Sequence, residues 1–276
     1  MSYVQPTYPT DLKFSEWQAI EPLLPKPEAR GGRTGRPRQW SLCLILNAIF
    51  YITRSGNAWR MLPKGFPPWK TVYSYFWTWT RSGLWAQINA ALVEQVRKKR
   101  GRRPQPSAAI IDSQSVKTAE GGEQRGVDVH KQTAGRKRHV VVDTLGLILI
   151  VLVHSAGVPD GTGGKQVLQR LFERIKGVSY NRHCRLSTIW ADGAYEAIVG
   201  WVKLMLGWTL EIVRRPSDAQ GWMVLPKRWI VERTFGWLGR YRRLSRDFEH
   251  TVQSSEAMVY IASIRRMLKL VHTCPH

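Results

Sequence analysis

The hydrophobic pattern of this chain changes near Ser107. From there, apolar runs of strand length alternate with amphipathic helical segments, in the order strand, hairpin, helix, strand, helix, strand, helix. Elements in this order form a sheet with helices packed against it, because each apolar face must be buried. The pattern therefore predicts an α/β domain with a mixed sheet over residues 107–276.

The strands and helices of this half are marked by their composition. Short apolar runs in SAAIIDS, LSTIWADGAYE and WTLEIVRR predict buried strands, and RKRHVVVDTLGLILIVLVHSA predicts a hairpin that turns at residues 143–146. Helices are predicted in GKQVLQRLFERIKG, AIVGWVKLMLG and the basic segment KRWIVERTFGWLGRYRRLSR. Asp143 lies in the hairpin turn, where aspartate is common for backbone reasons, and we interpret it as structural.

The first part of the chain shows helical patterns and predicts an all-α domain. One helix is expected to begin after Ser41, a capping residue, and to stop at Gly56. A short helix, a turn rich in proline and glycine, and a helix that opens with WKTVYSYF follow. This is the order of a helix-turn-helix, whose second helix would offer Lys70, Thr71 and Tyr73 to the major groove of DNA. A plain helical bundle with an aromatic core is the alternative.

The charge of the chain favours a polyanionic partner. Its 42 Lys and Arg against 20 Asp and Glu give a formal net charge of +22, which points most often to nucleic acid, with a merely basic protein as the alternative. The basic stretch RKKRGRRPQP, residues 97–106, predicts a solvated linker that ends a helical domain of residues 1–106. The stretch rich in Gly, Pro and Arg at residues 26–40 is either a DNA-contacting arm or a solvated linker.

Cysteine usage and apolar lengths favour a cytoplasmic protein without a membrane partner. Cys43, Cys184 and Cys274 lack the CxxC spacing of a zinc or redox site, so we expect them to be reduced. The N-terminus has no signal-peptide pattern, and the longest apolar stretches are too short to span a bilayer.

Two aspartates follow apolar runs that are predicted to be buried. Asp112 closes the first predicted strand in AIID, and Asp192 closes a later one in TIWAD. In open α/β sheets the reactive groups project from the carboxyl ends of strands, and an unpaired negative charge there is costly. The two acids therefore require a cation, which is either an arginine or a metal ion.

A third acid stands alone in the basic helix. Val231, Phe235 and Leu238 form the apolar stripe of this helix, and Glu232 lies at the edge of the stripe, from which it can reach the end of the sheet. Three carboxylates suit Mg²⁺ or Mn²⁺, and a pair of such ions can promote in-line phosphoryl transfer. Glu232 is therefore interpreted as a metal ligand beside the two aspartates.

Several motifs together resemble the Insertion Sequence Five family of bacterial DDE transposases, over nearly the whole chain. The stretch IIDSQSVK is similar to the family's first aspartate motif, WADGAYE to its second, and RWIVERTFGWLGRYRRLSRDFE to its glutamate-bearing helix. The stretch GRKRHVVVDTLGLILIVLVHSA resembles its central basic hairpin, and WRMLPKGFPPWKTVYSYFWTW its N-terminal DNA-binding region.

The resemblance implies an RNase H-like catalytic domain in residues 107–276, where Asp112, Asp192 and Glu232 would be the catalytic carboxylates that bind two Mg²⁺ or Mn²⁺ ions. It implies an enzyme that binds the terminal inverted repeats of a transposon, nicks the DNA at the element ends and joins the exposed 3′-hydroxyl ends to target DNA. The implied partners are both DNAs and further copies of the chain, in a homodimer or larger assembly on DNA. Such a protein would lie with the bacterial nucleoid.

The resemblance also suggests DNA contacts near the acids. The family's third motif carries Tyr, Arg, Glu and Lys at fixed spacing, and Arg228 stands at the Arg position. Leu225 occupies the Tyr position and Gly239 the Lys position, with Arg240 one residue further on. The remaining basic residues that we interpret as DNA contacts are Arg233, Arg243 and the run Arg136, Lys137 and Arg138. A solvated, charged strand end is the alternative for that run.

Three alternatives stay open at this point. A metal-dependent nuclease without strand transfer and a catalytically silent, transposase-derived DNA-binding protein would share the fold. A basic RNA-binding protein is the third, although the chain lacks the aromatic motif of an RRM and the loop of a KH domain. In any DNA-processing role, Trp190 and Trp237 flank the acids and could stack on a flipped base.

Overall fold

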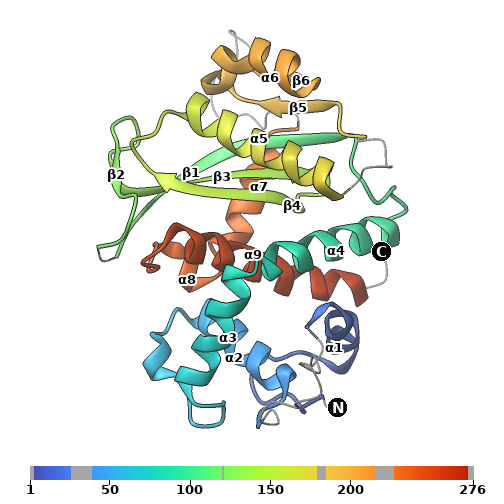
Figure 1. The fold of residues 1–276 in the computed structure, drawn as a ribbon, viewed down its shortest axis with the longest axis vertical. Coiled ribbons are helices and arrows are strands. Elements are labelled where there is room, and N and C mark those ends of the chain that lie inside the picture. The colour runs from blue at the N-terminus through green and yellow to red at the C-terminus, as the bar shows by residue number, and fades with distance from the viewer. Residues whose placement is uncertain (1–2, 26–38, 120, 179–184, 215–226, 273–276) are drawn as a thin grey trace, which may run out of the picture.

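The structure is a computed structural model that describes residues 3–25, 39–119, 121–178, 185–214 and 227–272. Leu225, two of the cysteines (Cys184 and Cys274) and most of the arm predicted at residues 26–40 lie outside these residues. The elements fall into two groups, helices α1 to α3 below and a sheet with its covering helices above (Figure 1).

The N-terminal group is helical, as the sequence predicts. Helix α2 begins directly after Ser41, whose hydroxyl accepts a hydrogen bond from the Cys43 amide at 3.2 Å. It ends before Gly56, which adopts the left-handed conformation with φ of 78°. The bounds of this group are α1 (Phe14–Ile20), η1 (Glu21–Leu23), α2 (Leu42–Ser55), η2 (Trp59–Met61) and α3 (Trp69–Arg81). Helix α4 (Leu84–Lys99) follows and belongs with the helices that cover the sheet.

In the part of the chain that the structure describes, one mixed sheet of six strands forms the upper part of the molecule. Its order is β2, β3, β1, β5, β6, and β4 also pairs with β3. Strand β1 runs antiparallel to β3 and parallel to β5, so the predicted mixed sheet is confirmed. The bounds are β1 (Ala108–Lys117), β2 (Gly126–Asp128), β3 (Thr133–Asp143), β4 (Ile148–Ser155), β5 (Thr188–Ala191) and β6 (Thr209–Ile212).

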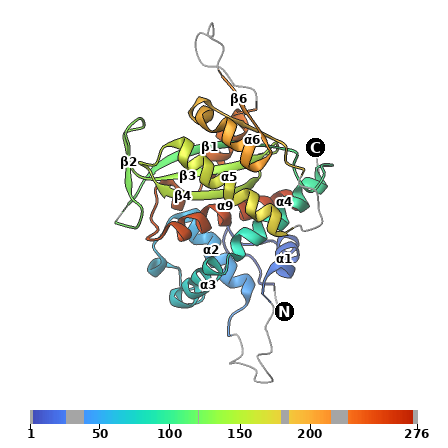
Figure 2. The ribbon, with the colours of Figure 1, turned by 45° about the horizontal axis from the view of Figure 1, so that its top comes forward.

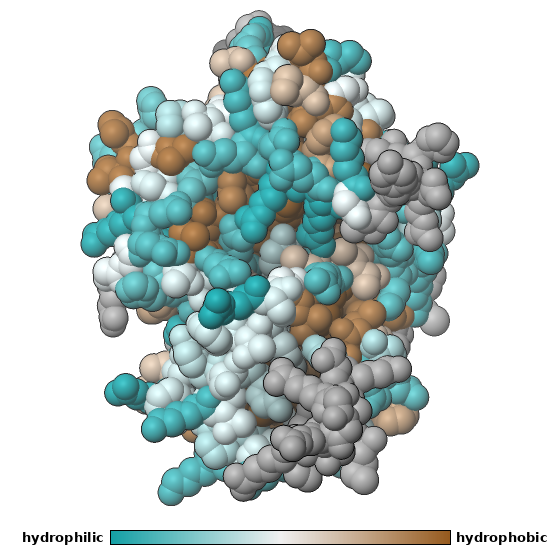
Figure 3. All heavy atoms as spheres, viewed as in Figure 1, coloured by the Kyte–Doolittle hydropathy of each residue, from teal (hydrophilic) through white to brown (hydrophobic). Residues whose placement is uncertain are grey.

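Helices cover both faces of the sheet (Figures 1 and 2). Ile111 of β1 packs into one apolar cluster with α5 (Asp160–Val178) and α6 (Val199–Leu206), whereas Ile110 packs into a second cluster with α4, α7 (Trp229–Leu238) and α9 (Val252–His272). This alternation follows from the two-residue period of a strand. The outer side of α5 faces solvent and is hydrophilic (Figure 3).

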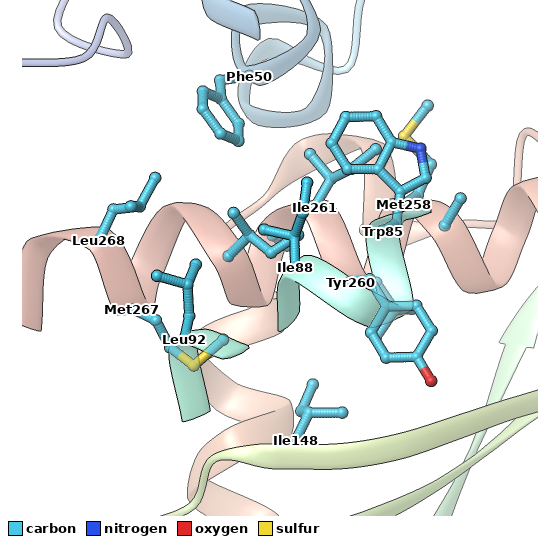
Figure 4. Packing of buried hydrophobic residues seen from close by; sticks show 14 of the residues in the cluster. Phe50, Trp85, Ile88, Leu92, Ile148, Met258, Tyr260, Ile261, Met267 and Leu268 are labelled. Carbon is cyan, nitrogen blue, oxygen red and sulfur yellow. The ribbon is translucent and has the colours of Figure 1, made fainter. Parts of the chain in front are cut away.

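The long helix α9 joins the two groups of elements. It lies with α4 between the sheet and helices α1 to α3, and Ile261 and Leu268 of α9 lie near Ile88 and Leu92 of α4 in one core (Figure 4). Helix α9, strand β2 and the short element η3 (Gly193–Ile198) were not predicted. The single helix predicted for the basic segment KRWIVERTFGWLGRYRRLSR is divided, because α7 ends at Leu238 and α8 (Arg242–Ser245) follows it. The boundary predicted after residue 106 falls between α4 and β1 and stays a prediction, because the core continues across it.

The predicted solvated linker at residues 97–106 is only partly correct. Helix α4 continues to Lys99, and Arg97 is buried because its guanidinium pairs with Asp143 of the sheet. Among the described residues, no helix has the length and apolar character needed to cross a membrane.

Candidate active site

Strands β1 and β5 bring the two aspartates level with each other. In their parallel pairing Ile110 faces Trp190, and two residues further along each chain the same register reaches Asp112 and Asp192. The expectation that Asp112 closes its strand is wrong, because β1 stays paired to β3 as far as Lys117. It is the neighbouring strand β5 that ends, at Ala191, one residue before Asp192.

Helix α7 carries Glu232 toward the two aspartates. Val231 and Leu238 of α7 are buried against the sheet, whereas the Glu232 side chain is 54% exposed. The β3–β4 turn holds the helix, since the Thr234 hydroxyl donates to the Gly146 carbonyl at 3.1 Å. Gly146 has φ of 79°, and a Cβ added there would meet the Thr234 Oγ1 at 2.8 Å. This close approach of turn and helix fixes the position of Glu232.

All three acids converge on one guanidinium group. The Arg228 Nη2 lies 3.8 Å from the nearest carboxylate oxygen of Asp112, 3.5 Å from that of Asp192 and 3.7 Å from that of Glu232. Because all three oxygens lie within 4 Å of the same nitrogen, they also lie close to one another. The Arg228 side chain is only 16% exposed, so the four groups form one half-buried cluster at the N-terminus of α7.

The two aspartates differ in their electrostatic environment. Burial, together with the neighbouring Asp192 charge, raises the pKa of Asp112 to about 6, against the opposing effects of the Ser113 amide and of Arg228. That amide donates to the Asp112 Oδ1 at 2.7 Å. Asp192 is more exposed and caps the following short helix, where its Oδ1 accepts from the Ala194 amide at 3.0 Å. Asp112 is thus the acid whose charge most needs a nearby cation.

The donor set of this cluster fits a hard divalent cation. It consists of carboxylates alone, without thiol or imidazole, which is the ligand chemistry of Mg²⁺ and Mn²⁺. In this structure the three carboxylates surround the Arg228 guanidinium. Among the residues that the structure describes, no three Asp, Glu, His or Cys side chains are grouped closely enough to hold a metal ion. Metal binding therefore requires the acids to exchange the guanidinium for another cation.

A second polar network supports the strand beneath Asp112. The Ser113 hydroxyl donates to Asp160 at 2.7 Å, and the Lys137 ammonium lies 3.1 Å from the same carboxylate and 3.4 Å from Asp128. These groups lie on the side of β1 opposite to Asp112, because adjacent residues in a strand point to opposite faces. The network fixes the backbone that carries the site.

Comparison with known proteins identifies the family. Residues 103–266 match the family model described as a transposase DDE domain. The chain belongs to the DDE transposases. Residues 12–89 of the transposase match a second model, which is described as a transposase of the IS4/5 family. The resemblance inferred from the motifs is therefore confirmed, as is the RNase H-like α/β fold of the catalytic domain.

One curated relative supports the same assignment. The transposase is 28% identical over 112 residues to the insertion element IS402 uncharacterized 16.2 kDa protein of Burkholderia cepacia. The match covers 40% of this chain and 75% of that protein.

The basic run of β3 is not available to DNA in the transposase. Arg136 and Arg138 are fully buried, where the Arg136 guanidinium donates to the Glu249 and His250 carbonyls, each at 2.7 Å. Arg138 donates to the Leu244 carbonyl at 2.8 Å. Lys137 is 4% exposed and belongs to the network under Asp112. The expectation that Arg136, Lys137 and Arg138 contact DNA is therefore wrong: a charged run that resembles a solvated strand end lies inside the protein.

The basic residues of the acid-bearing segment have different surroundings. Arg243 is buried and its Nε lies 2.7 Å from Glu249, so its assignment to DNA is also wrong. Arg233 is half-buried and its guanidinium lies over the rings of Trp229 and Trp237. Arg240 is exposed. Arg233 and Arg240 stay predictions as DNA contacts, and Arg228 proves to be the partner of the acids.

Two tryptophans that flank the acids already contact cations. The Trp237 ring lies under the guanidinium of Arg266 at 3.2 Å, and the Trp190 ring lies under the Lys227 ammonium at 4.0 Å. Both rings would have to lose these contacts before a flipped base could stack on the same face. Arg266 was not among the residues predicted from the sequence, although the adjacent arginines of IRRMLK are a signal for it.

Helix α3 presents a polar and aromatic face to solvent. Lys70, Tyr73 and Trp77 are exposed, Thr71 is half-buried, and Phe76 packs inward. The first turn of α3 follows a Pro- and Gly-rich turn, as a recognition helix would. The three predicted contacts are accessible, and their role in DNA binding stays a prediction.

Proposed function

We propose that this transposase binds the terminal inverted repeats of a mobile element, cleaves the DNA at the element ends and joins the 3′-hydroxyl ends to target DNA. The observation that carries the proposal is the convergence of Asp112, Asp192 and Glu232 on one half-buried cation. Such a cluster costs stability in a protein that does not use it, because desolvated like charges repel one another.

The three carboxylates would hold two Mg²⁺ or Mn²⁺ ions in the working enzyme. When bound, such ions activate the attacking hydroxyl and stabilise the leaving oxygen of an in-line phosphoryl transfer. Asp112 is fixed by the sheet, Asp192 by its amide contact and Glu232 by the turn on α7. These contacts orient the carboxylates around Arg228, and the same scaffold would present them to the ions once the guanidinium is displaced.

Helix α3 would bind the DNA at a second place, separate from the acid cluster. Its exposed face, with Lys70 and Tyr73, is accessible to a major groove. Joining two element ends requires two sites, so we infer that the enzyme acts as a homodimer or a larger assembly on DNA.

The test is strand cleavage of DNA that carries the element's own ends, with purified protein and Mg²⁺ or Mn²⁺. Asp192→Asn should keep DNA binding but abolish cleavage, because one donor loses its charge while its shape is preserved. Glu173→Gln is the matched control, since Glu173 is exposed on α5 and is not part of the cluster, and it should cleave like the wild type.

The products separate the alternatives. Cleavage followed by covalent joining to a target plasmid supports the transposase, whereas cleavage without any joined product would indicate a nuclease. Binding of both ends without cleavage would indicate a silent DNA-binding protein. Equal cleavage by Asp192→Asn and the wild type would exclude the acid cluster as the site.

A further inference from the structure

A basic pocket lies where the N-terminal helices meet α7 and α9. It has a volume of about 460 Å³. Ten described residues from four parts of the chain build its wall. Half of them are cationic, namely Arg54, Arg240, Arg265, Arg266 and Lys269, and none of the ten is acidic.

Most of the positive charge in this pocket is not neutralised by the protein. Arg265 pairs with Glu16 at 2.9 Å. Within the described residues, no ion pair involves Arg54, Arg266 or Lys269. Burial, followed by the neighbouring Arg233, lowers the pKa of Arg266 to about 10, against the opposing effects of Tyr241 and Asp143. Several like charges held together in this way are costly unless an anion joins them.

The geometry of the aromatic wall favours phosphate over a base. Arg266 lies over the Trp237 ring at 3.2 Å, and Arg233 lies over the same ring at 4.6 Å. Arg54 lies 5.3 Å from the centre of the Tyr241 ring. The rings, together with the Arg240 carbonyl to which Arg54 donates, thus hold the guanidinium groups in place. Planar guanidinium groups that are fixed in advance are suited to phosphate oxygens.

We propose that this pocket binds backbone phosphates of the DNA strand whose end reaches the acid cluster. The inference rests on the proposed function, since it assumes that the partner is DNA, and it adds a binding site formed by Arg54, Arg266 and Lys269.

The position of the pocket on α7 suits this role. Glu232 lies in the first turn of α7, and the helix ends at Leu238, beside the pocket residues Arg240 and Tyr241. Six residues of helix span about 9 Å, which about three nucleotides cover at about 3.4 Å per step. A strand in the pocket would contact both the N-terminal helices, through Arg54, and the catalytic domain, and so would fix the register of the DNA at the acids.

The first experiment measures DNA affinity against salt concentration. The probe is a labelled duplex of the element end with a single-stranded overhang, and the variants are Arg54→Ala and Lys269→Ala in the full chain. Both side chains are exposed, so the fold should persist. Each variant should lower the slope of log affinity against log salt by about 1, as expected for the loss of one phosphate contact. The control Lys203→Ala removes the same charge from α6 and should keep the wild-type slope.

Phosphate replacement then locates the contact. Single phosphates of the probe are replaced in turn by neutral methylphosphonates. The wild type should lose affinity when the phosphate is replaced at one or two positions within a few nucleotides of the cleavage site. For Lys269→Ala, replacement at those same positions should cause no further loss of affinity relative to the unmodified probe. If the pocket variants behave like Lys203→Ala while the wild type binds and cleaves DNA, the pocket inference is overturned and the proposed function stands. If the wild type itself fails to bind DNA, the proposed function fails.

A competition experiment distinguishes DNA from a free polyphosphate. Tripolyphosphate binding to the wild type is measured by calorimetry, with and without saturating duplex. Release of tripolyphosphate by the duplex supports a DNA site. Binding that is weakened by Arg54→Ala yet unaffected by saturating DNA would show that the occupant is a free polyphosphate, and would overturn the assignment to DNA.

Discussion

The Arg228 guanidinium lies 3.5 Å from the Asp192 carboxylate, and the same nitrogen is within 4 Å of both other acids of the cluster. The guanidinium comes from the start of the helix that also carries Glu232, so helix packing brings the acid and its counter-charge to the sheet together. Arg228 thus offsets the repulsion among carboxylates that the fold forces close to one another.

Replacing Arg228 should change how the protein responds to divalent ions. Arg228→Gln removes the charge that balances the acids, so we expect the metal-free midpoint of thermal unfolding to fall by about 2–4 °C, which corresponds to roughly 1 kcal/mol for a chain of this size. Mn²⁺ should then raise the midpoint of the variant more than that of the wild type. Thermal unfolding with and without Mn²⁺ checks this. Arg100→Gln, at the exposed end of α4, is the control, and an equal Mn²⁺ response in all three proteins would contradict the prediction.

Lys70 should contribute to the binding of element ends. Because it is exposed at the start of α3, Lys70→Ala should weaken binding and lower the salt slope by about 1 if the side chain meets a phosphate. If it reads a base instead, the preference for the element end over a shuffled duplex should fall by about 1–3 kcal/mol. Fluorescence anisotropy with both duplexes measures both effects. A result identical to that of Lys203→Ala would argue against α3 as the recognition helix.

Asp143 should be required for stability rather than for chemistry. It is fully buried, pairs with Arg97, and accepts from the Leu145 and Leu147 amides at 2.9 and 2.8 Å. Asp143→Ala leaves a buried guanidinium unpaired, so the free energy of unfolding should fall by about 3–5 kcal/mol. Urea unfolding measures this, with Glu173→Ala as the surface control. A loss below about 1 kcal/mol would show that the ion pair is not formed in solution.

The buried His139 should make the protein sensitive to mild acid. Burial and the neighbouring His154 lower the pKa of His139 to about 3, and its Nδ1 lies 2.8 Å from the His154 Nε2. A depressed histidine pKa means that the unfolded chain binds the proton first, so this group destabilises the fold as the pH falls from about 6.5 toward 3. The effect is at most about 1.4 kcal/mol per pH unit.

The comparison of His139→Gln with the wild type isolates this contribution. Asp112, whose raised pKa acts in the opposite direction between about pH 4 and 6, is common to both proteins and cancels. The variant should therefore lose less stability than the wild type between pH 7 and pH 5 in urea unfolding. Parallel losses in the two proteins would mean that His139 is not buried in its neutral form.

The sequence by itself determined the local elements and the identity of the three acids. Ser41 and Gly56 bound their helix through capping chemistry that lies within a few residues, and the hairpin of β3 and β4 follows from two apolar runs around one turn. Asp112 and Asp192 could be singled out because each follows an apolar run that must be buried. The resemblance to the family's third motif then supported Glu232 and singled out Arg228.

Only the tertiary structure decided which charges are inside. The run from Arg136 to Arg138 has the composition of a solvated surface, yet β3 lies between β1 and β4. Carbonyls of Leu244 in α8 and of Glu249 after it accept hydrogen bonds from these side chains. The basic pocket likewise joins α2 to α9, more than two hundred residues apart in the chain. Burial and charge pairing depend on which distant segments of the chain come into contact, and a local sequence pattern does not predict those contacts.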